Sequence, residues 1–213
     1  MRDPGWTPVE LARLSELGSP AAVQDFLDSI PYSLDPVYRC PRSVLRDGRA
    51  HCFDGAVFAA AALAAYGHRP LIFELKAVRD DDHVLAAFQA DGHWGAVGKS
   101  NCAGLRFREP VFRTRRELVM SYFELYFNVE SEKTLRSYSA LLDLDRSIGG
   151  GWRLEDGCMA RIAAHLDRLR HHPVVTPAMV RRLAPVDSRS YAAGMLGSDE
   201  RGLFRPGPAG DGD

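Results

Sequence analysis

The sequence lacks a surplus of charge of either sign. It has 213 residues, with 27 Lys and Arg against 28 Asp and Glu, and a formal net charge of -1. No run of five Lys or Arg residues occurs in it. Affinity for nucleic acids depends largely on cationic side chains that neutralise phosphates. We therefore expect no nucleic-acid partner.

The sequence also lacks paired cysteines. Its four cysteines are spread singly, with no Cys-x-x-Cys pair: Cys40, Cys52, Cys102 and Cys158. The sequence thus lacks the regular cysteine spacing that marks a zinc site or a secreted disulfide scaffold. Asp80 to His83 offers carboxylates and an imidazole, but adjacent residues rarely converge on one ion. We expect a reduced, cytoplasmic protein with no metal and no cofactor.

Long apolar runs are absent as well. The longest, residues 56–66, is too short to span a bilayer, and the first residues are acidic and interrupted by Pro4. We expect no membrane partner. The length fits a single domain over residues 1–202, and the Gly-, Pro- and Asp-rich residues 203–213 predict a disordered tail.

Residues 49–67 contain the most informative helix signal. After Cys52 the chain is almost entirely small and apolar up to Tyr66, and Gly67 ends the run. Alanine is the strongest helix former, and a helix that is apolar all round must be buried all round. The sequence thus predicts a central buried helix with Cys52 in or just before its first turn.

Three strand-like runs follow this helix, over residues 71–78, 83–90 and 94–101. Asp91-Gly92 between the last two is a strong hairpin signal. The middle run is apolar on both faces, as expected inside a sheet that is covered on both sides. A buried helix followed by an antiparallel meander indicates an α+β fold.

Helices are also predicted around this core. Ser19-Pro20 and Thr176-Pro177 are typical helix starts, and Thr114 is a third. The expected helices cover residues 20–30, 42–47, 114–127 and 154–170, and a short one begins at 177. Residues 133–145 are expected to form a strand or a covering arm.

Cys52, His83 and Asn101 are the candidate catalytic residues. A thiol becomes a good nucleophile when a helix N-terminus and an imidazole stabilise its thiolate. Cys52 has the first by position, and His83 opens the central strand, from which it is expected to reach the helix end. A three-residue hairpin loop would place Asn101 opposite His83, and a two-residue loop would place Ser100 there. We prefer Asn101, whose amide oxygen is able to accept the ring N–H.

The residues around this trio form three motifs: Arg49-Ala50-His51-Cys52-Phe53-Asp54-Gly55-Ala56, Asp82-His83-Val84-Leu85, and Gly92-His93-Trp94-Gly95-Ala96-Val97-Gly98-Lys99-Ser100-Asn101. Together they resemble the core of the transglutaminase-like superfamily. The flanking residues, including Leu105-Arg106-Phe107-Arg108-Glu109-Pro110, resemble an uncharacterised bacterial branch of it. The resemblance covers residues 49–101, about a quarter of the chain. The start of the helix is also similar to that of arylamine N-acetyltransferases.

The resemblance implies a papain-like α+β fold and acyl transfer through a Cys52 thioester, with His83 exchanging protons. The substrate would be a peptide, a protein or a small acyl or amide compound, and the acceptor water or an amine. The family's usual third residue is an Asp about four residues after the Trp, which falls here on Gly98. Ser100 and Asn101 are the nearest polar substitutes.

Three functions therefore stay open. We expect a cysteine-dependent enzyme, namely a peptidase, amidase or transamidase. The alternative is a catalytically inactive domain that binds a peptide or partner protein in the same cleft, as Gly98 suggests. An N-acyltransferase ranks third. It would need a pocket for an acyl-CoA donor, and no Gly-rich or basic stretch of the sequence indicates a nucleotide site.

Overall fold

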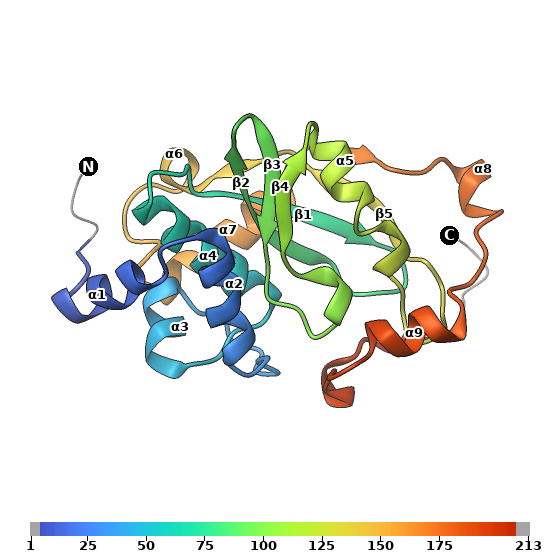
Figure 1. Ribbon diagram of the computed structural model, residues 1–213, viewed down its shortest axis with the longest axis horizontal. Helices are drawn as coiled ribbons and strands as arrows, with labels where there is room; N and C mark the ends of the chain where they lie inside the picture. Colours follow the sequence, from blue (N-terminus) through green and yellow to red (C-terminus); the bar gives the residue numbers. More distant parts are fainter. Residues whose placement is uncertain (1–4, 208–213) are drawn as a thin grey trace.

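A computed structural model of the chain, which describes residues 5–207, has an α+β architecture built on one antiparallel sheet (Figure 1). Over the described residues the sheet has seven strands in the order β4-β3-β2-β1-β5-β7, and β6 pairs with β1. The strands are β1 (Leu71–Ala77), β2 (His83–Ala90), β3 (His93–Val97), β4 (Arg108–Phe112), β5 (Leu135–Ser139), β6 (Leu142–Asp143) and β7 (His171–Pro173). The α+β prediction is confirmed.

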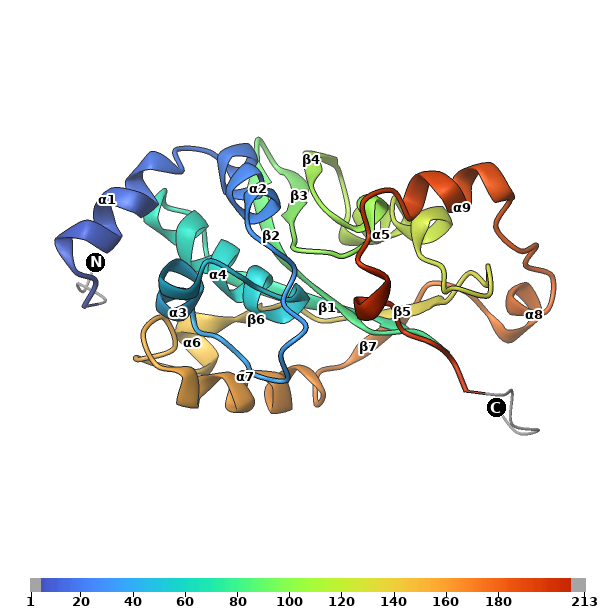
Figure 2. The ribbon, with the colours of Figure 1, turned by 90° about the horizontal axis from the view of Figure 1, so that it is seen from below.

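Helices surround the sheet and cluster by chain order. The N-terminal helices lie at one end of the long axis, and α8 and α9 lie at the other (Figures 1 and 2). The α-helices are α1 (Pro8–Glu16), α2 (Pro20–Ser29), α3 (Pro41–Asp47), α4 (Cys52–Ala65), α5 (Arg115–Met120), α6 (Leu144–Ser147), α7 (Met159–Leu166), α8 (Pro177–Val180) and α9 (Ser188–Gly194). Short 3-10 turns are η1 (Ala103–Leu105), η2 (Phe123–Leu125), η3 (Asp156–Cys158) and η4 (Glu200–Gly202).

The predicted helix starts are confirmed, but two helices are shorter than predicted. The Ser19, Thr114 and Thr176 side chains each accept a main-chain N–H of the helix that follows. Helix α5 ends at Met120, where the Ser121 hydroxyl donates to the Leu118 carbonyl and the chain tightens toward η2. Of the helix predicted over residues 154–170, only α7 is α-helical: η3 precedes it, and residues 171–173 beyond the predicted end pair with β5.

Helix α4 is the buried centre of the molecule. Every residue from Phe53 to Leu63 is buried, and the helix packs on β2 with α1, α2 and α3 around it. A Cβ atom added at Gly55 would stand 2.3 Å from the Lys99 Cβ, so the chain after β3 passes almost against the helix backbone. The predicted central buried helix is confirmed. Within residues 5–207, the structure contains no helix whose length and apolar character would allow it to cross a bilayer.

The sheet separates two apolar cores. Val84, Ala86 and Phe88 of β2 pack with α4, α7 and the N-terminal helices. Leu85 and Ala87 of the same strand pack with α5, Leu105 and the tyrosines that follow α5. Side chains alternate along a strand, so β2 contributes to both cores and is apolar throughout. This confirms the prediction of a central strand covered on both sides.

The β2–β3 hairpin has a two-residue loop. Asp91 and Gly92 both have positive φ, 49° and 78°, as a type I′ turn requires, and Ala86 pairs with Val97. Strand β3 ends at Val97 rather than Asn101, because the Gly98 N–H and carbonyl are bonded to the Gln24 side chain at 3.1 and 3.0 Å. No ladder therefore continues opposite His83.

Gly55→Ala should destabilise the protein by about 1–3 kcal/mol, because the added methyl overlaps the Lys99 side chain where it leaves the backbone. Urea unfolding monitored by circular dichroism measures the change. Gly18→Ala is the matched control, since nothing lies within 4 Å of the Cβ it adds. Equal unfolding midpoints for the two variants would contradict the close approach.

Candidate functional site

Cys52 is the first residue of α4, and its position is fixed by an unusual helix cap. The His51 Nδ1 accepts the N–H of Phe53 at 3.2 Å and that of Asp54 at 3.5 Å, and the Asp54 carboxylate accepts the His51 N–H at 3.4 Å. An imidazole replaces the usual Ser, Thr or Asp in this reciprocal cap. Since Nδ1 accepts, His51 is neutral here and its other nitrogen, Nε2, bears the proton.

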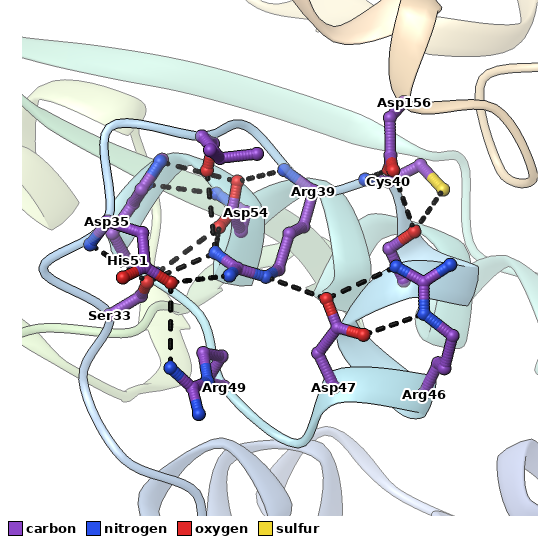
Figure 3. A network of polar contacts seen from close by, with 12 residues as sticks. Ser33, Asp35, Arg39, Cys40, Arg46, Asp47, Arg49, His51, Asp54 and Asp156 are labelled. Carbon is purple, nitrogen blue, oxygen red and sulfur yellow. Dashed lines mark hydrogen bonds and ion pairs between the residues drawn. The ribbon is translucent and has the colours of Figure 1, made fainter.

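A polar network around the buried Arg39 holds the loop in front of α4 (Figure 3). The Arg39 guanidinium bonds Asp35 at 2.6 Å, Asp47 at 3.0 Å and Ser33 at 3.1 Å, and its Nη1 lies 3.9 Å from Asp54. The Arg39 N–H also donates to Asp54 at 2.8 Å. Because Arg39 and Asp54 are both buried, the network ties residues 33–39 rigidly to the first turn of α4.

Burial controls the protonation of Asp54 and His51. It raises the pKa of Asp54 to about 7, although the Arg39 and His51 N–H groups act to lower it. Burial, helped by the Arg39 charge, lowers the pKa of His51 to about 4. His51 therefore stays neutral, and able to cap the helix, down to mildly acidic pH.

The Cys52 thiol lies against the main chain on both sides of His83. Its Sγ is 3.9 Å from the Asp82 carbonyl oxygen, to which the thiol donates. Burial raises the pKa of Cys52 to about 11; a hydrogen bond from the Val84 main chain lowers it only in part. At neutral pH the structure thus contains a thiol, not a thiolate.

The His83 imidazole points to the sheet face opposite α4. By strand alternation it shares the face of Leu85 and Ala87, and its Nε2 lies 2.8 Å from the Leu105 carbonyl oxygen. A carbonyl only accepts, so Nε2 carries the proton and Nδ1 has the free lone pair. Burial lowers the pKa of His83 to about 4, so the ring is neutral as well.

Cys52 and His83 line one small cavity. Its volume is about 60 Å³, and Tyr32, Leu105 and Tyr126 are among the residues of its wall. No hydrogen bond joins Cys52 to His83 in the part of the chain that the structure describes. The nucleophile and base candidates thus share a cavity at the start of β2 without forming a bonded pair.

Asn101 lies in the cavity wall but does not contact His83 through a hydrogen bond. Its side-chain amide bonds the Asp199 main chain instead, from Nδ2 to the carbonyl and from the N–H to Oδ1, each at 2.9 Å. The Ser100 hydroxyl accepts the Cys102 N–H at 3.0 Å. A Cβ at Gly98 would stand 3.5 Å from the His83 Nε2, so this position does border the imidazole but supplies no carboxylate.

Several residues of the site were not predicted from the sequence. The Leu105 carbonyl partners His83, but main-chain atoms leave no mark in residue type. The Tyr32 hydroxyl lies within hydrogen-bonding reach of the Cys52 main-chain N–H. Burial raises the pKa of Tyr32, and this hydrogen bond lowers it by less. Leu203 and Phe204, from the segment predicted as a tail, line the cavity, and residues 208–213 lie outside the described residues.

No metal-binding cluster accompanies the site. Among residues 5–207, no group of three or more His, Cys, Asp and Glu side chains has the geometry to hold a metal ion. Two of the three aspartates of the cavity wall have other partners: Asp80 accepts the Thr134 hydroxyl at 2.7 Å, and Asp82 pairs with Lys76 at 2.6 Å. The arrangement is able to supply a nucleophile, a base and main-chain donors.

His51→Ala should lower the free energy of unfolding by about 1 kcal/mol, because two N–H groups at the start of α4 lose their acceptor. His51→Asn should recover most of this loss, since the Asn carboxamide is a good cap. Urea titration of the three proteins provides the measurement. Wild-type stability in His51→Ala would show that the imidazole does not cap the helix.

The alkylation rate of Cys52 by iodoacetamide should rise nearly tenfold per pH unit from pH 7 to pH 10. Only the thiolate reacts, and a pKa of about 11 keeps its fraction small and increasing throughout that range. Peptide-resolved mass spectrometry gives the rate, and a free cysteine peptide, which flattens near pH ~8.5, is the reference. A plateau for Cys52 below pH 8 would reveal a preformed thiolate.

Comparisons with known proteins leave the family of the chain open. No protein-family model matches the sequence, and no curated protein matches it. Among solved structures, Legionella pneumophila LapG is similar with a TM-score of 0.39 and 14% identity, over 72% of this chain and 84% of that chain. A structure of EGTA-treated Legionella pneumophila LapG is similar with a TM-score of 0.38 and 15% identity, again over 72% of this chain and 84% of that chain.

Proposed function

We propose that this protein is a cysteine-dependent acyl-transfer enzyme that acts on an amide or thioester, as a peptidase, amidase or transamidase. One observation carries the proposal: Cys52 begins a buried helix in the same cavity as His83, whose Nε2 is bonded to the Leu105 carbonyl. That bond leaves Nδ1 as the basic nitrogen. Nucleophile, base and orienting group are therefore all available in one place.

The neutral states of the two residues define how the reaction would begin. The Nδ1 of His83 takes the thiol proton as the Cys52 Sγ attacks the substrate carbonyl carbon, so no thiolate is needed in the resting enzyme. The imidazolium that forms keeps its Nε2–H on the Leu105 carbonyl. It then gives the Nδ1 proton to the leaving amine or thiol, and a Cys52 thioester remains.

The second half of the reaction uses the same groups in reverse. His83 removes a proton from water or from an acceptor amine, which attacks the thioester, and the proton returns to the Cys52 sulfur as it leaves. We assign the Cys52 main-chain N–H, at the N-terminus of α4 beside the Tyr32 hydroxyl, as a donor to the tetrahedral oxygen.

A catalytically inactive binding domain is the second candidate. Two observations favour it: Cys52 and His83 form no hydrogen bond within the described residues, and Gly98 borders the imidazole without a side chain. Such a domain would use the same cavity and its surroundings to hold a peptide or a partner protein.

Incubation with an activated ester or a peptide thioester should acylate Cys52, detected as an intact-mass adduct mapped by peptide sequencing. Cys52→Ala should abolish the adduct while keeping the fold, and His83→Ala should slow its formation by roughly 10²- to 10⁴-fold.

Cys102→Ala is the matched control, because this second thiol lines the same cavity and its pKa is also raised by burial to about 11. We expect it to be acylated at the wild-type rate. Labelling that persists in Cys52→Ala but is lost in Cys102→Ala would overturn the assignment. Absence of any adduct, with ester substrates that react readily with free thiols, would favour the binding domain.

A further inference from the structure

The segment after α9 returns to the candidate site instead of leaving the molecule. From α9 the chain turns back toward the strands and passes over them as a separate stretch, drawn in dark red in Figure 2. Met195, Gly202, Leu203 and Phe204 line the cavity that contains Cys52. We refer to residues 195–207 as the covering segment.

Asn101 binds the covering segment through the main chain of Asp199 and not through a side chain. The Asn101 carboxamide donates to the Asp199 carbonyl and accepts the Asp199 N–H, both at 2.9 Å. Asp199 has extended backbone angles, φ -83° and ψ 115°. A side-chain amide thus makes the same pair of bonds as a neighbouring β-strand would, and any non-proline residue with an extended backbone satisfies it.

The covering segment lies between two hollows, and this arrangement indicates a groove beneath it. The cavity at Cys52 holds about 60 Å³, room for a few water molecules and not for a peptide. A second hollow, of about 460 Å³, is lined by Asn101 and Tyr32 together with Asp199 and Arg201 of the segment. Asn101 and Tyr32 belong to both walls, so removal of the segment would join the two hollows.

The covering segment is held at three places along its length. Beyond the Asn101 pair, a Cβ at Gly202 would come within 2.6 Å of Leu34 and 3.1 Å of the Asn101 amide, so the chain lies tightly there. Farther on, the Arg79 guanidinium donates to the Gly207 carbonyl at 3.0 Å. Residues 203–207 thus lie against the rest of the protein, although their composition predicts a free tail.

We propose that the surface from Cys52 to Asn101 is a groove for an extended polypeptide, and that residues 199–204 of this chain occupy it as an autoinhibitory cover. The proposal rests on the proposed function, because it names the substrate class of that site. Asn101 becomes a peptide-binding residue rather than the partner of His83. Polypeptide substrates would enter after the covering segment is displaced.

Release of the covering segment would also change the environment of the thiol. Leu203 and Phe204 line the cavity that contains Cys52, and burial raises the pKa of this thiol. Water entering the open groove would solvate a thiolate better, and the N-terminus of α4 would then stabilise it. The covered protein is accordingly the less reactive form.

Hydrogen exchange of the full-length protein is the first test. The Asp199 amide should exchange at least about tenfold more slowly than the same amide in a synthetic peptide of residues 195–207. Exchange at the rate of the free peptide would overturn the proposal at once.

Two full-length variants provide the second test. Asp199→Pro removes the N–H that donates to Asn101, whereas the matched control Asp199→Ala keeps it and loses only the carboxylate. Asp199→Pro should raise the alkylation rate of Cys52 roughly tenfold or more over Asp199→Ala. It should also remove the protection of residues 195–207 from hydrogen exchange. Deprotection without faster alkylation would show that the segment does not cover Cys52. Unchanged protection would show that the Asn101 pair does not hold it.

Addition of the synthetic peptide tests the groove itself. It should slow Cys52 alkylation again in Asp199→Pro, but not in the full-length variant Asn101→Ala, which lacks the peptide-reading amide. Equal slowing in both variants, or in neither, would overturn the role of Asn101. None of these readouts requires turnover. If the groove behaves as described but no acyl adduct ever forms, the proposed chemistry fails and the groove stands.

Discussion

The burial of helix α4 from Phe53 to Leu63 is the constraint on which the rest of the structure depends. Its alanine-rich surface allows strands and helices to approach the helix axis from every side, as Gly55 against Lys99 illustrates. A helix surrounded in this way has little freedom to slide or rotate. Its first residue, Cys52, is therefore positioned by core packing and not by a flexible loop. The Arg39–Asp54 network extends this rigidity to the residues in front of the helix.

Side-chain amides replace strand pairing where the sheet runs out. Gln24 bonds both the N–H and the carbonyl of Gly98 directly after β3, and Asn101 does the same for Asp199. Main-chain polar groups near a buried site need partners, and a carboxamide satisfies both at once. The result is a stretch from Gly98 to Asn101 that is fixed in place without belonging to a strand. Ser100 and Asn101, at the end of this stretch, line the cavity that contains Cys52.

The sequence allowed the core to be predicted more fully than the site. Strong local signals located α4, the three strands after it and the Asp91-Gly92 turn, because each depends on propensity and periodicity within a few residues. The partner of His83 was not predictable, since the Leu105 carbonyl is a main-chain atom on a turn twenty-two residues away. The position of Leu203 and Phe204 in the cavity wall was likewise not predictable. The composition of a segment does not indicate which distant surface the segment packs against. Strand β3 ended early for a similar reason: Gln24, far away in the sequence, captures Gly98.

The sheet divides the site between two cores, and this has a consequence for how the protein tolerates change. Cys52 begins α4, whose buried residues form one core, whereas the Leu105 partner of His83 belongs to the core beneath α5. Their separation is set by the main chain of β2, which both cores share and which side-chain substitutions alter least. Either core is thus free to accumulate compensating substitutions in the course of evolution without disturbing the other. Homologues are accordingly expected to diverge widely in both interiors while the first residues of β2 keep the thiol and the imidazole at a constant spacing.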